Sequence, residues 1–271
     1  MLVQFSSRNF KSFKDTFTLD LFTNKETSAS SLYPAGGLIV YPSAVFYGAN
    51  GSGKSNVLKA FAMMRRLVLN HDKVIQSTDT MPMEQFRLSH ESEDDSTAFD
   101  ITFVFEGKKY KYGFEYGRED DRSIVYSEYL YVYETARPTI VFEYDLDENN
   151  GNIKVTKYKE LERIPHMKNS LFLWEADRFS NEVAKKVLQW FNASHYVEFS
   201  SRHPLSPAYW ENLGKPAVRK IFQNFMRDAD LGIKDIFQDV TPVSPRHTGI
   251  RNLPTNAVVE EITVRTLHPK F

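Results

Sequence analysis

A short stretch near residue 50 combines glycine, lysine and serine at a spacing that can hold phosphate. Gly48, Gly53, Lys54 and Ser55 fit the pattern G-x-x-x-x-G-K-[ST]. Glycine allows backbone angles that a Cβ forbids, so main-chain N–H groups in such a loop can approach phosphate oxygens. The lysine ammonium can reach the β- and γ-phosphates, and the serine hydroxyl can ligate Mg²⁺. We therefore expect this stretch to bind a nucleoside triphosphate together with Mg²⁺.

The pattern is meaningful where a strand leads into the loop and a helix leaves it. Ala44 to Tyr47 is a short apolar run, for which we predict a strand. From about Ser55 onwards apolar residues recur at helical spacing, which predicts a helix with one face on a sheet. The N-terminal end of that helix would present its positive dipole to the phosphates. The predicted nucleotide-binding residues are Gly48, Ala49, Asn50, Gly51, Ser52, Gly53, Lys54, Ser55 and Asn56, with Ser55 as the Mg²⁺ ligand.

Hydrolysis would also need a carboxylate that fixes Mg²⁺ and a group that orients water. The usual source is a strand of four apolar residues that ends in Asp. VVEEI at 258–262 has only two apolar residues before Glu260 and Glu261. EYDLDE at 143–148 alternates like the end of a surface strand. We therefore identify no catalytic residue and expect the chain alone to be inactive as an ATPase.

The rest of the first half predicts an antiparallel β-meander. Apolar and polar residues alternate over 99–105 and again over 110–116, on either side of the turn EGKK. In the second half, Ser180 is a predicted helix N-cap and Pro216 a predicted helix start. The other predicted elements are strands at 2–5, 17–21, 124–133, 139–144, 153–155 and 258–267, and a proline-rich linker at 241–256.

Composition excludes several classes of protein. The 271 residues carry a net charge of -1, which gives no overall attraction to nucleic acid or to an anionic membrane. Cysteine is absent, so there are no disulfides or thiolate metal sites. No apolar run approaches the roughly 18 residues of a membrane helix. We expect a cytoplasmic protein without membrane contact.

Two further groups of polar residues resemble metal sites only superficially. Asp145, Asp147 and Asn149 begin like a calcium loop, but Asn150 and Thr156 stand where such a loop needs Gly and Glu. We therefore predict a hairpin turn there. His195 and His203 are eight residues apart, and surface or capping roles are expected for them rather than metal binding.

Four stretches together resemble one group of ATPases: RNFKSFKDTFTLDL, FYGANGSGKSNVLKAF, FDITFVFEGKKYKYGFEY and DADLGIKDI. The group has ABC-type heads, like the SMC, RecF and OLD-like proteins, and includes AAA-family and abortive-infection proteins. The resemblance implies an α/β P-loop NTPase fold. Its parts would be a β-rich nucleotide-binding lobe at 1–160, a helical lobe at 161–240, and a linker and strand at 241–271.

The resemblance also implies a mechanism. Two heads would form a homodimer, each trapping ATP between its own loop and a signature motif of the other. Lys11 matches a basic residue that lies near the nucleotide in the family. A nuclease effector and DNA would be candidate partners, in antiphage defence or DNA transactions. The family's γ-phosphate-sensing glutamine has no clear match, because 170–179 offers Glu175 and Arg178, and Gln85 comes earlier.

The signature motif, the Asp-Glu strand and the switch histidine of the family have no match before the sequence ends at RTLHPKF, and His268 lacks the preceding apolar strand. The resemblance therefore implies the N-terminal portion of a longer ATPase or one half of a split one. A non-hydrolysing nucleotide sensor or interaction module remains the main alternative. A small-molecule kinase is a third, against which the meander and the missing catalytic carboxylate argue.

Overall fold

The computed structural model describes eleven stretches of the chain. They form two compact units, Met1–Val197 and Glu198–Phe271. The predicted lobe boundaries near residues 160 and 240 remain predictions. The described residues are 1–23, 33–35, 38–69, 80–93, 95–120, 122–135, 137–147, 151–196, 214–228, 233–242 and 258–266.

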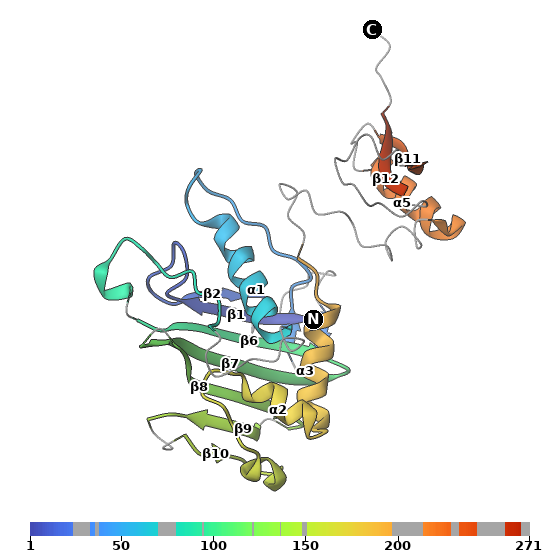
Figure 1. Ribbon diagram of the computed structural model, residues 1–271. Coiled ribbons are helices and arrows are strands. Elements are labelled where there is room, and N and C mark those ends of the chain that lie inside the picture. Colours follow the sequence, from blue (N-terminus) through green and yellow to red (C-terminus); the bar gives the residue numbers. More distant parts are fainter. Residues whose placement is uncertain are drawn as a thin grey trace. The chain divides into compact units, whose positions relative to one another are not determined.

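A seven-stranded antiparallel sheet forms the centre of the first unit (Figure 1). Its strands arise from the alternation of large apolar and polar side chains, which places one set of residues on each face. The predicted hairpin is confirmed, with Phe103 opposite Tyr110 and Phe105 opposite Lys108. Across the sheet the order is β10 (Ile153–Lys154), β9 (Thr139–Asp145), β8 (Arg122–Tyr133), β7 (Lys108–Glu119), β6 (Thr97–Phe105), β1 (Leu2–Arg8) and β2 (Phe17–Asp20).

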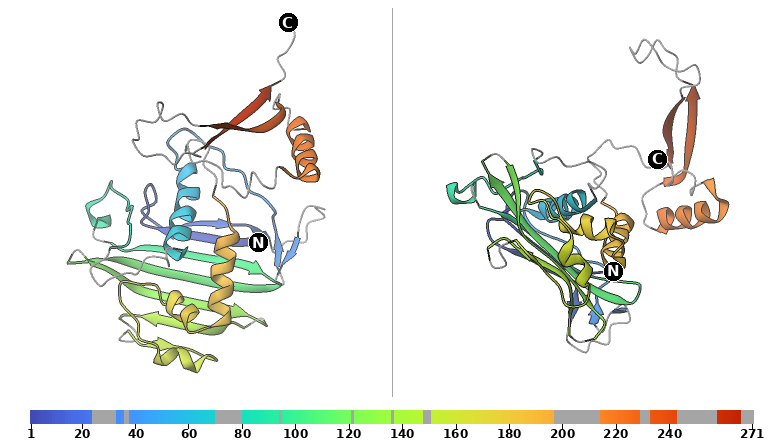
Figure 2. Two further views of the ribbon diagram at one scale, coloured as in Figure 1. Left: turned by 45° about the vertical axis from the view of Figure 1, so that its right-hand side comes forward. Right: turned by 60° about the horizontal axis from the view of Figure 1, so that its bottom comes forward.

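Three helices cover one face of this sheet (Figures 1 and 2). They are α1 (Lys54–Leu69), α2 (Phe172–Arg178) and α3 (Glu182–Ala193). Phe103 stacks on Trp190 of α3 with a centroid separation of 4.2 Å. The Trp174 indole of α2 donates to the carbonyl of Val68 in α1 at 2.8 Å. The core of the unit therefore lies between the sheet and these helices.

A β-bulge in β8 turns a carboxylate into that core. Ser127 pairs with Glu115 and Val125 with Tyr116, so Tyr126 is an extra residue and the alternation changes phase after it. Glu128 is consequently fully buried.

The Glu128 carboxylate caps the N-terminus of α2. It accepts hydrogen bonds from the Phe172 and Leu173 amides at 2.5 and 3.0 Å, and from the Tyr112 hydroxyl at 2.9 Å. Burial raises the pKa of Glu128 to about 7, against the opposing effect of these donors. The carboxylate thus connects the meander to the helical layer.

The predicted helix N-cap at Ser180 is wrong by one residue. The Asn181 side chain accepts from the amides of Val183 and Ala184 at 3.1 and 3.0 Å and caps α3. Ser180 instead has a φ of 63° in the turn between α2 and α3. Both residue types cap helices well, and the tightness of this turn decides between them.

Smaller elements complete the two units. The Asp147 amide donates to the Asp145 carboxylate at 2.9 Å, as in the predicted hairpin turn, while Asn149 lies outside the described residues.

In the second unit, α5 (Pro216–Asp228) begins at Pro216 as predicted. The unpredicted strand β11 (Ile233–Pro242) pairs with β12 (Val258–Thr266), and most of the predicted linker, 243–256, lies outside the described residues. Among the described residues, the other elements are β3 (Phe22–Thr23), β5 (Leu38–Val40) and β4 (Tyr33–Ala35), which form a small sheet in that order, and the 3₁₀ helices η2 (His90–Ser92) and η3 (Lys159–Arg163).

Candidate nucleotide-binding site

The glycine loop of residues 48–56 lies on the surface and leads directly into α1. The helix begins at Lys54, close to the predicted start at Ser55. Gly51 and Gly53 have φ angles of 80° and 91°, which residues with a Cβ rarely adopt. The Asn56 amide donates to the Gly53 carbonyl at 2.8 Å and closes the first turn. The predicted transition from a glycine loop into a helix is therefore confirmed, and phosphate binding there stays a prediction.

The segment that precedes the loop differs from the prediction. Ala44 to Tyr47 was predicted to be a strand, but the structure has no strand there. Val45 is 70% exposed and Tyr47 is 88% exposed. A strand needs a neighbour to complete its hydrogen bonds, and no described strand pairs with this segment. The predicted strand is therefore wrong for the described part of the chain. An apolar composition favours a strand but does not supply the neighbouring strand that it must pair with.

The Lys54 ammonium points back into the loop. It donates to the carbonyls of Gly48 and Ala49 at 2.8 and 2.6 Å and lies 3.4 Å from the Ser52 hydroxyl. The first turn of α1 contains no acidic residue. A lysine charge and the positive end of a helix dipole are thus concentrated where an anion would be held.

Ser55 and Lys11 differ in their surroundings. Ser55 is exposed in the first turn of α1 beside Lys54. Lys11 belongs to the turn between β1 and β2, where its ammonium forms an ion pair with Glu84 and its amide donates to the Glu84 carbonyl at 2.7 Å. The neighbouring residue Ser12 contacts the glycine loop. Lys11 is therefore one residue away from a direct contact with the loop, with its charge directed at Glu84.

The side chains considered for the γ-phosphate-sensing role have local partners. Arg178 and Glu175 form an ion pair at 2.9 Å within α2. Gln85 donates to the carbonyls of Glu93 and Asp95 at 3.0 and 2.9 Å. These contacts brace a helix and a surface segment, and none of them involves the glycine loop.

The carboxylates considered for hydrolysis also lie elsewhere. Glu143 of β9 pairs with Lys154 at 2.9 Å and accepts from the Tyr131 hydroxyl at 2.7 Å. Glu260 and Glu261 lie in β12, opposite Val240 and Asp239 of β11. In the described part of the chain, no carboxylate forms an ion pair with Lys54, and no group of three or more His, Asp or Glu side chains could hold a metal ion. His195 is exposed, and His203 lies outside the described residues.

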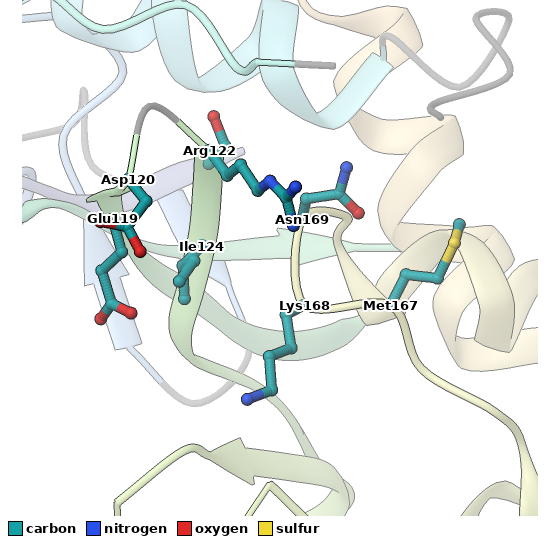
Figure 3. A pocket seen from close by; sticks show the side chains of 8 residues that line it. Glu119, Asp120, Arg122, Ile124, Met167, Lys168 and Asn169 are labelled. Atoms are coloured by element: carbon teal, nitrogen blue, oxygen red, sulfur yellow. The ribbon is translucent and has the colours of Figure 1, made fainter. Parts of the chain in front are cut away.

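Two cavities bordered by described residues of the first unit have no residue of the glycine loop in their lining. A cavity of about 570 Å³ opens at the turn between β7 and β8 (Figure 3). Arg122 of β8 and Asn169, from the segment before α2, both line it, and the Lys168 side chain extends in a different direction in this view. A second, smaller cavity of about 200 Å³ is bordered by Arg8, Asp100 and Glu115. Both mix acidic and basic groups, so neither favours a ligand of one charge. The larger cavity is lined by Glu119, Asp120, Arg122, Ser123, Ile124, Met167, Lys168 and Asn169.

Comparison with known families identifies the broad class of protein to which the chain belongs. Residues 43–241 match the family model described as "AAA domain, putative AbiEii toxin, Type IV TA system". The chain belongs to this AAA-domain family. Membership indicates a P-loop NTPase that binds nucleotide, and such domains generally use ATP and Mg²⁺. A search of curated proteins finds no match. Among the described residues, no helix is long and apolar enough to cross a membrane.

Proposed function

We propose that the chain binds ATP with Mg²⁺ at residues 48–56. The observation that carries the proposal is the Lys54 ammonium, turned into a glycine loop at the N-terminus of α1. Backbone N–H groups of the loop would hold phosphate oxygens, and Lys54 would neutralise their charge. Lys11 would approach the nucleotide from the adjacent turn after exchanging its Glu84 partner for phosphate.

The Ser55 hydroxyl would contribute one ligand to Mg²⁺. The residues fit this ion in part, because Mg²⁺ takes oxygen ligands and is commonly held by one or two protein groups together with substrate phosphates and waters. When bound, the ion would neutralise charge on the phosphates. Ser55 would hold the ion beside the loop, and Lys54 would keep the phosphates in register.

Hydrolysis would require a carboxylate from outside the described residues. We propose that a C-terminal ATPase lobe and a second head complete the site, as in ABC-type proteins of the SMC, RecF and OLD-like branch. The segment 43–47 supports this, because Val45 and Tyr47 are exposed and none of the described strands pairs with it, which suits a covering strand. Nucleotide state would then control dimerisation of two heads.

The biological role we propose is coupling of this ATPase to an effector in antiphage defence or DNA transactions. The family description, which names an AbiEii toxin and a type IV toxin–antitoxin system, supports the defence context. A nuclease subunit is the effector class that we favour, with DNA as a further candidate partner. The cytoplasm is the compartment in which such a role would be exercised.

A non-hydrolysing nucleotide sensor is the second candidate. It is favoured by one observation: among the described residues, the Lys54 ammonium bonds to loop carbonyls and forms no ion pair with a carboxylate. Such a module would change its interactions when ATP binds, without turnover. Phosphate release separates the two candidates.

The test is titration of the chain with MgATP by calorimetry, comparing the parent with Lys54→Ala and Lys59→Ala. Loss of a charge-assisted contact should weaken binding by at least about tenfold in Lys54→Ala. Lys59 lies in the same helix beyond the loop, so Lys59→Ala should bind like the parent. Equal MgATP affinity of the parent and Lys54→Ala would contradict the proposed site.

Phosphate release measured on the same samples tests the mode of action. Little release by the chain alone, with release restored by a C-terminal lobe, would support hydrolysis in a completed head. No release in either case would favour the sensor. Steady release by the chain alone, abolished in Lys54→Ala, would overturn both the sensor and the requirement for completion.

A further inference from the structure

The turn between β1 and β2, residues 9–14, lies against the glycine loop. The Asn56 side-chain amide donates to the Ser12 hydroxyl at 2.9 Å. A Cβ built on Gly53 would stand 2.8 Å from the Ser12 Oγ and 3.6 Å from the nearest ring carbon of Phe13. The turn therefore contacts the loop at its third glycine and at the first turn of α1.

The turn is itself held firmly. Phe10 and Phe13 exchange two backbone hydrogen bonds, at 2.9 and 2.8 Å, which close it. Phe10 is fully buried and packs edge-on against Phe99 of β6 with a centroid separation of 5.8 Å. Phe13 stacks on Phe17 of β2 at 4.9 Å. A rigid element of the sheet thus supports a loop that is otherwise exposed.

Asn9 anchors the other side of the turn. It is fully buried, and its side-chain amide donates to the carbonyls of Ser92 and Asp95, both at 2.9 Å. Its side-chain oxygen accepts from the Phe86 amide at 3.1 Å. The Thr97 hydroxyl donates to its backbone carbonyl at 3.0 Å. Asn9 therefore ties the turn to Phe86, Ser92, Asp95 and Thr97 through four hydrogen bonds.

We infer that Ser12 and Asn56 are positioning residues that set the glycine loop for nucleotide. Their hydrogen bond links the first turn of α1 to the turn of residues 9–14, and Ser12 restricts the space beside Gly53. In this arrangement the Asn56 side chain holds the loop in place through its hydrogen bond to Ser12, and it does not contact phosphate itself. The inference deepens the proposed function and rests on ATP binding at residues 48–56.

The physical reason is preorganisation. A glycine-rich loop has many backbone conformations, and fixing it when ligand binds costs conformational entropy. A bond that already holds the loop near its binding conformation lowers that cost. Loss of one such hydrogen bond is expected to weaken MgATP affinity roughly three- to tenfold.

The experiment measures MgATP affinity for Ser12→Ala, Asn56→Ala, the double variant and Ser12→Thr, with unfolding midpoints recorded without nucleotide. Each alanine variant should lose roughly three- to tenfold in affinity, and the double variant no more than the larger single loss. Ser12→Thr keeps the hydroxyl and should retain binding. The unfolding midpoints should stay close to the parent's, since the bond is at the surface.

Ser6→Ala is the matched control. The Ser6 hydroxyl bonds to the Thr18 hydroxyl at 3.0 Å on the same β1–β2 hairpin, at a position away from the loop. Its loss should leave MgATP affinity unchanged. If Ser12→Ala does not fold, Asn56→Ala removes the same bond from the helix side and tests the inference by itself.

Two results would overturn the inference. In one, the Ser12 and Asn56 variants bind like the parent although Lys54→Ala does not; ATP binding then stands and the positioning role falls. In the other, the two losses add fully in the double variant, so the residues act separately. Unchanged binding in Lys54→Ala would instead reject the proposed function, and the inference with it.

Discussion

The sheet and the glycine loop of the first unit differ in how completely their apolar side chains are covered. Phe103 and Tyr112 of the sheet are fully buried, whereas Val45 and Tyr47 before the loop are 70% and 88% exposed. Burial of a large apolar side chain contributes about 1.5–3 kcal/mol, so the sheet carries the stability of the unit. The segment before the loop therefore contributes little to folding and leaves two large apolar side chains exposed.

The largest expected change in the free energy of unfolding is that of a substitution at Phe103 in the sheet. This residue stacks on Trp190 at 4.2 Å and on Tyr110 at 5.2 Å. Phe103→Ala should lower the free energy of unfolding by about 3–5 kcal/mol, because it removes a buried ring and leaves a cavity. Urea unfolding followed by circular dichroism measures the change. Phe179→Ala is the control: that ring is 59% exposed, and a comparable loss there would erase the contrast between covered and exposed aromatic residues.

The next effect concerns pH and the junction of β8 with α2. Burial raises the pKa of Glu128 from its ordinary value of 4.5 to about 7, and burial lowers the pKa of His166 from 6.5 to about 4. The stability from protonated Glu128 is complete below pH 4.5 and lost as pH rises to 7. The stability from neutral His166 is complete above pH 6.5 and lost as pH falls to 4. Each change is on the order of 3 kcal/mol, so the two slopes largely cancel in the parent.

Single variants should separate these slopes. In Glu128→Gln, stability should rise between pH 4 and 6.5, because His166 is then the one group of this pair that still titrates. In His166→Phe, which retains an aromatic ring beside Tyr144 and Phe172, stability should fall between pH 4.5 and 7. Urea midpoints at half-unit pH intervals give the profiles. Slopes of the same sign in both variants would contradict the assignment of the two pKa shifts.

The smallest effect is expected beside the glycine loop. Tyr47→Ser should change the free energy of unfolding by less than about 0.5 kcal/mol, because the ring makes little contact in the first unit. Urea unfolding of the variant beside the parent checks this. A loss above about 1.5 kcal/mol would show that segment 43–47 supports the fold, and would remove the difference between the loop side and the sheet.

Regular parts of the fold could be predicted because their signals are local. Apolar or aromatic side chains recur at every second position over 99–105 and 110–116, so the pairing of β6 with β7 could be predicted from this repeat. Val104 departs from the alternation, because it is apolar and is buried with Val3 and Val40. The helix after the glycine loop follows in the same way from apolar spacing. The loop residues themselves were found from spacing, because only certain residue types allow that backbone.

Other features depend on contacts between distant residues. The bulge at Tyr126 shifts the alternation of β8, so the burial of Glu128 could not be predicted from its neighbours. The strand β11 alternates weakly and acquires its partner β12 about 20 residues later. Ser12 could not be predicted as a site residue because its contact with Asn56 spans 44 positions, although its neighbour Lys11 matches a basic residue of the resembled family.

The capping of α2 by Glu128 has a consequence for how the unit opens. A seven-residue helix is too short to persist alone in water. If α2 unwound while β8 stayed in place, the buried Glu128 carboxyl group would lose the two backbone amides that donate to it, which is costly for a polar group without access to water. Local fraying of α2 is thereby coupled to opening of the sheet. The amide protons of Phe172 and Leu173 should exchange with solvent as slowly as those of the strands, so that helix and strand behave as one cooperative unit.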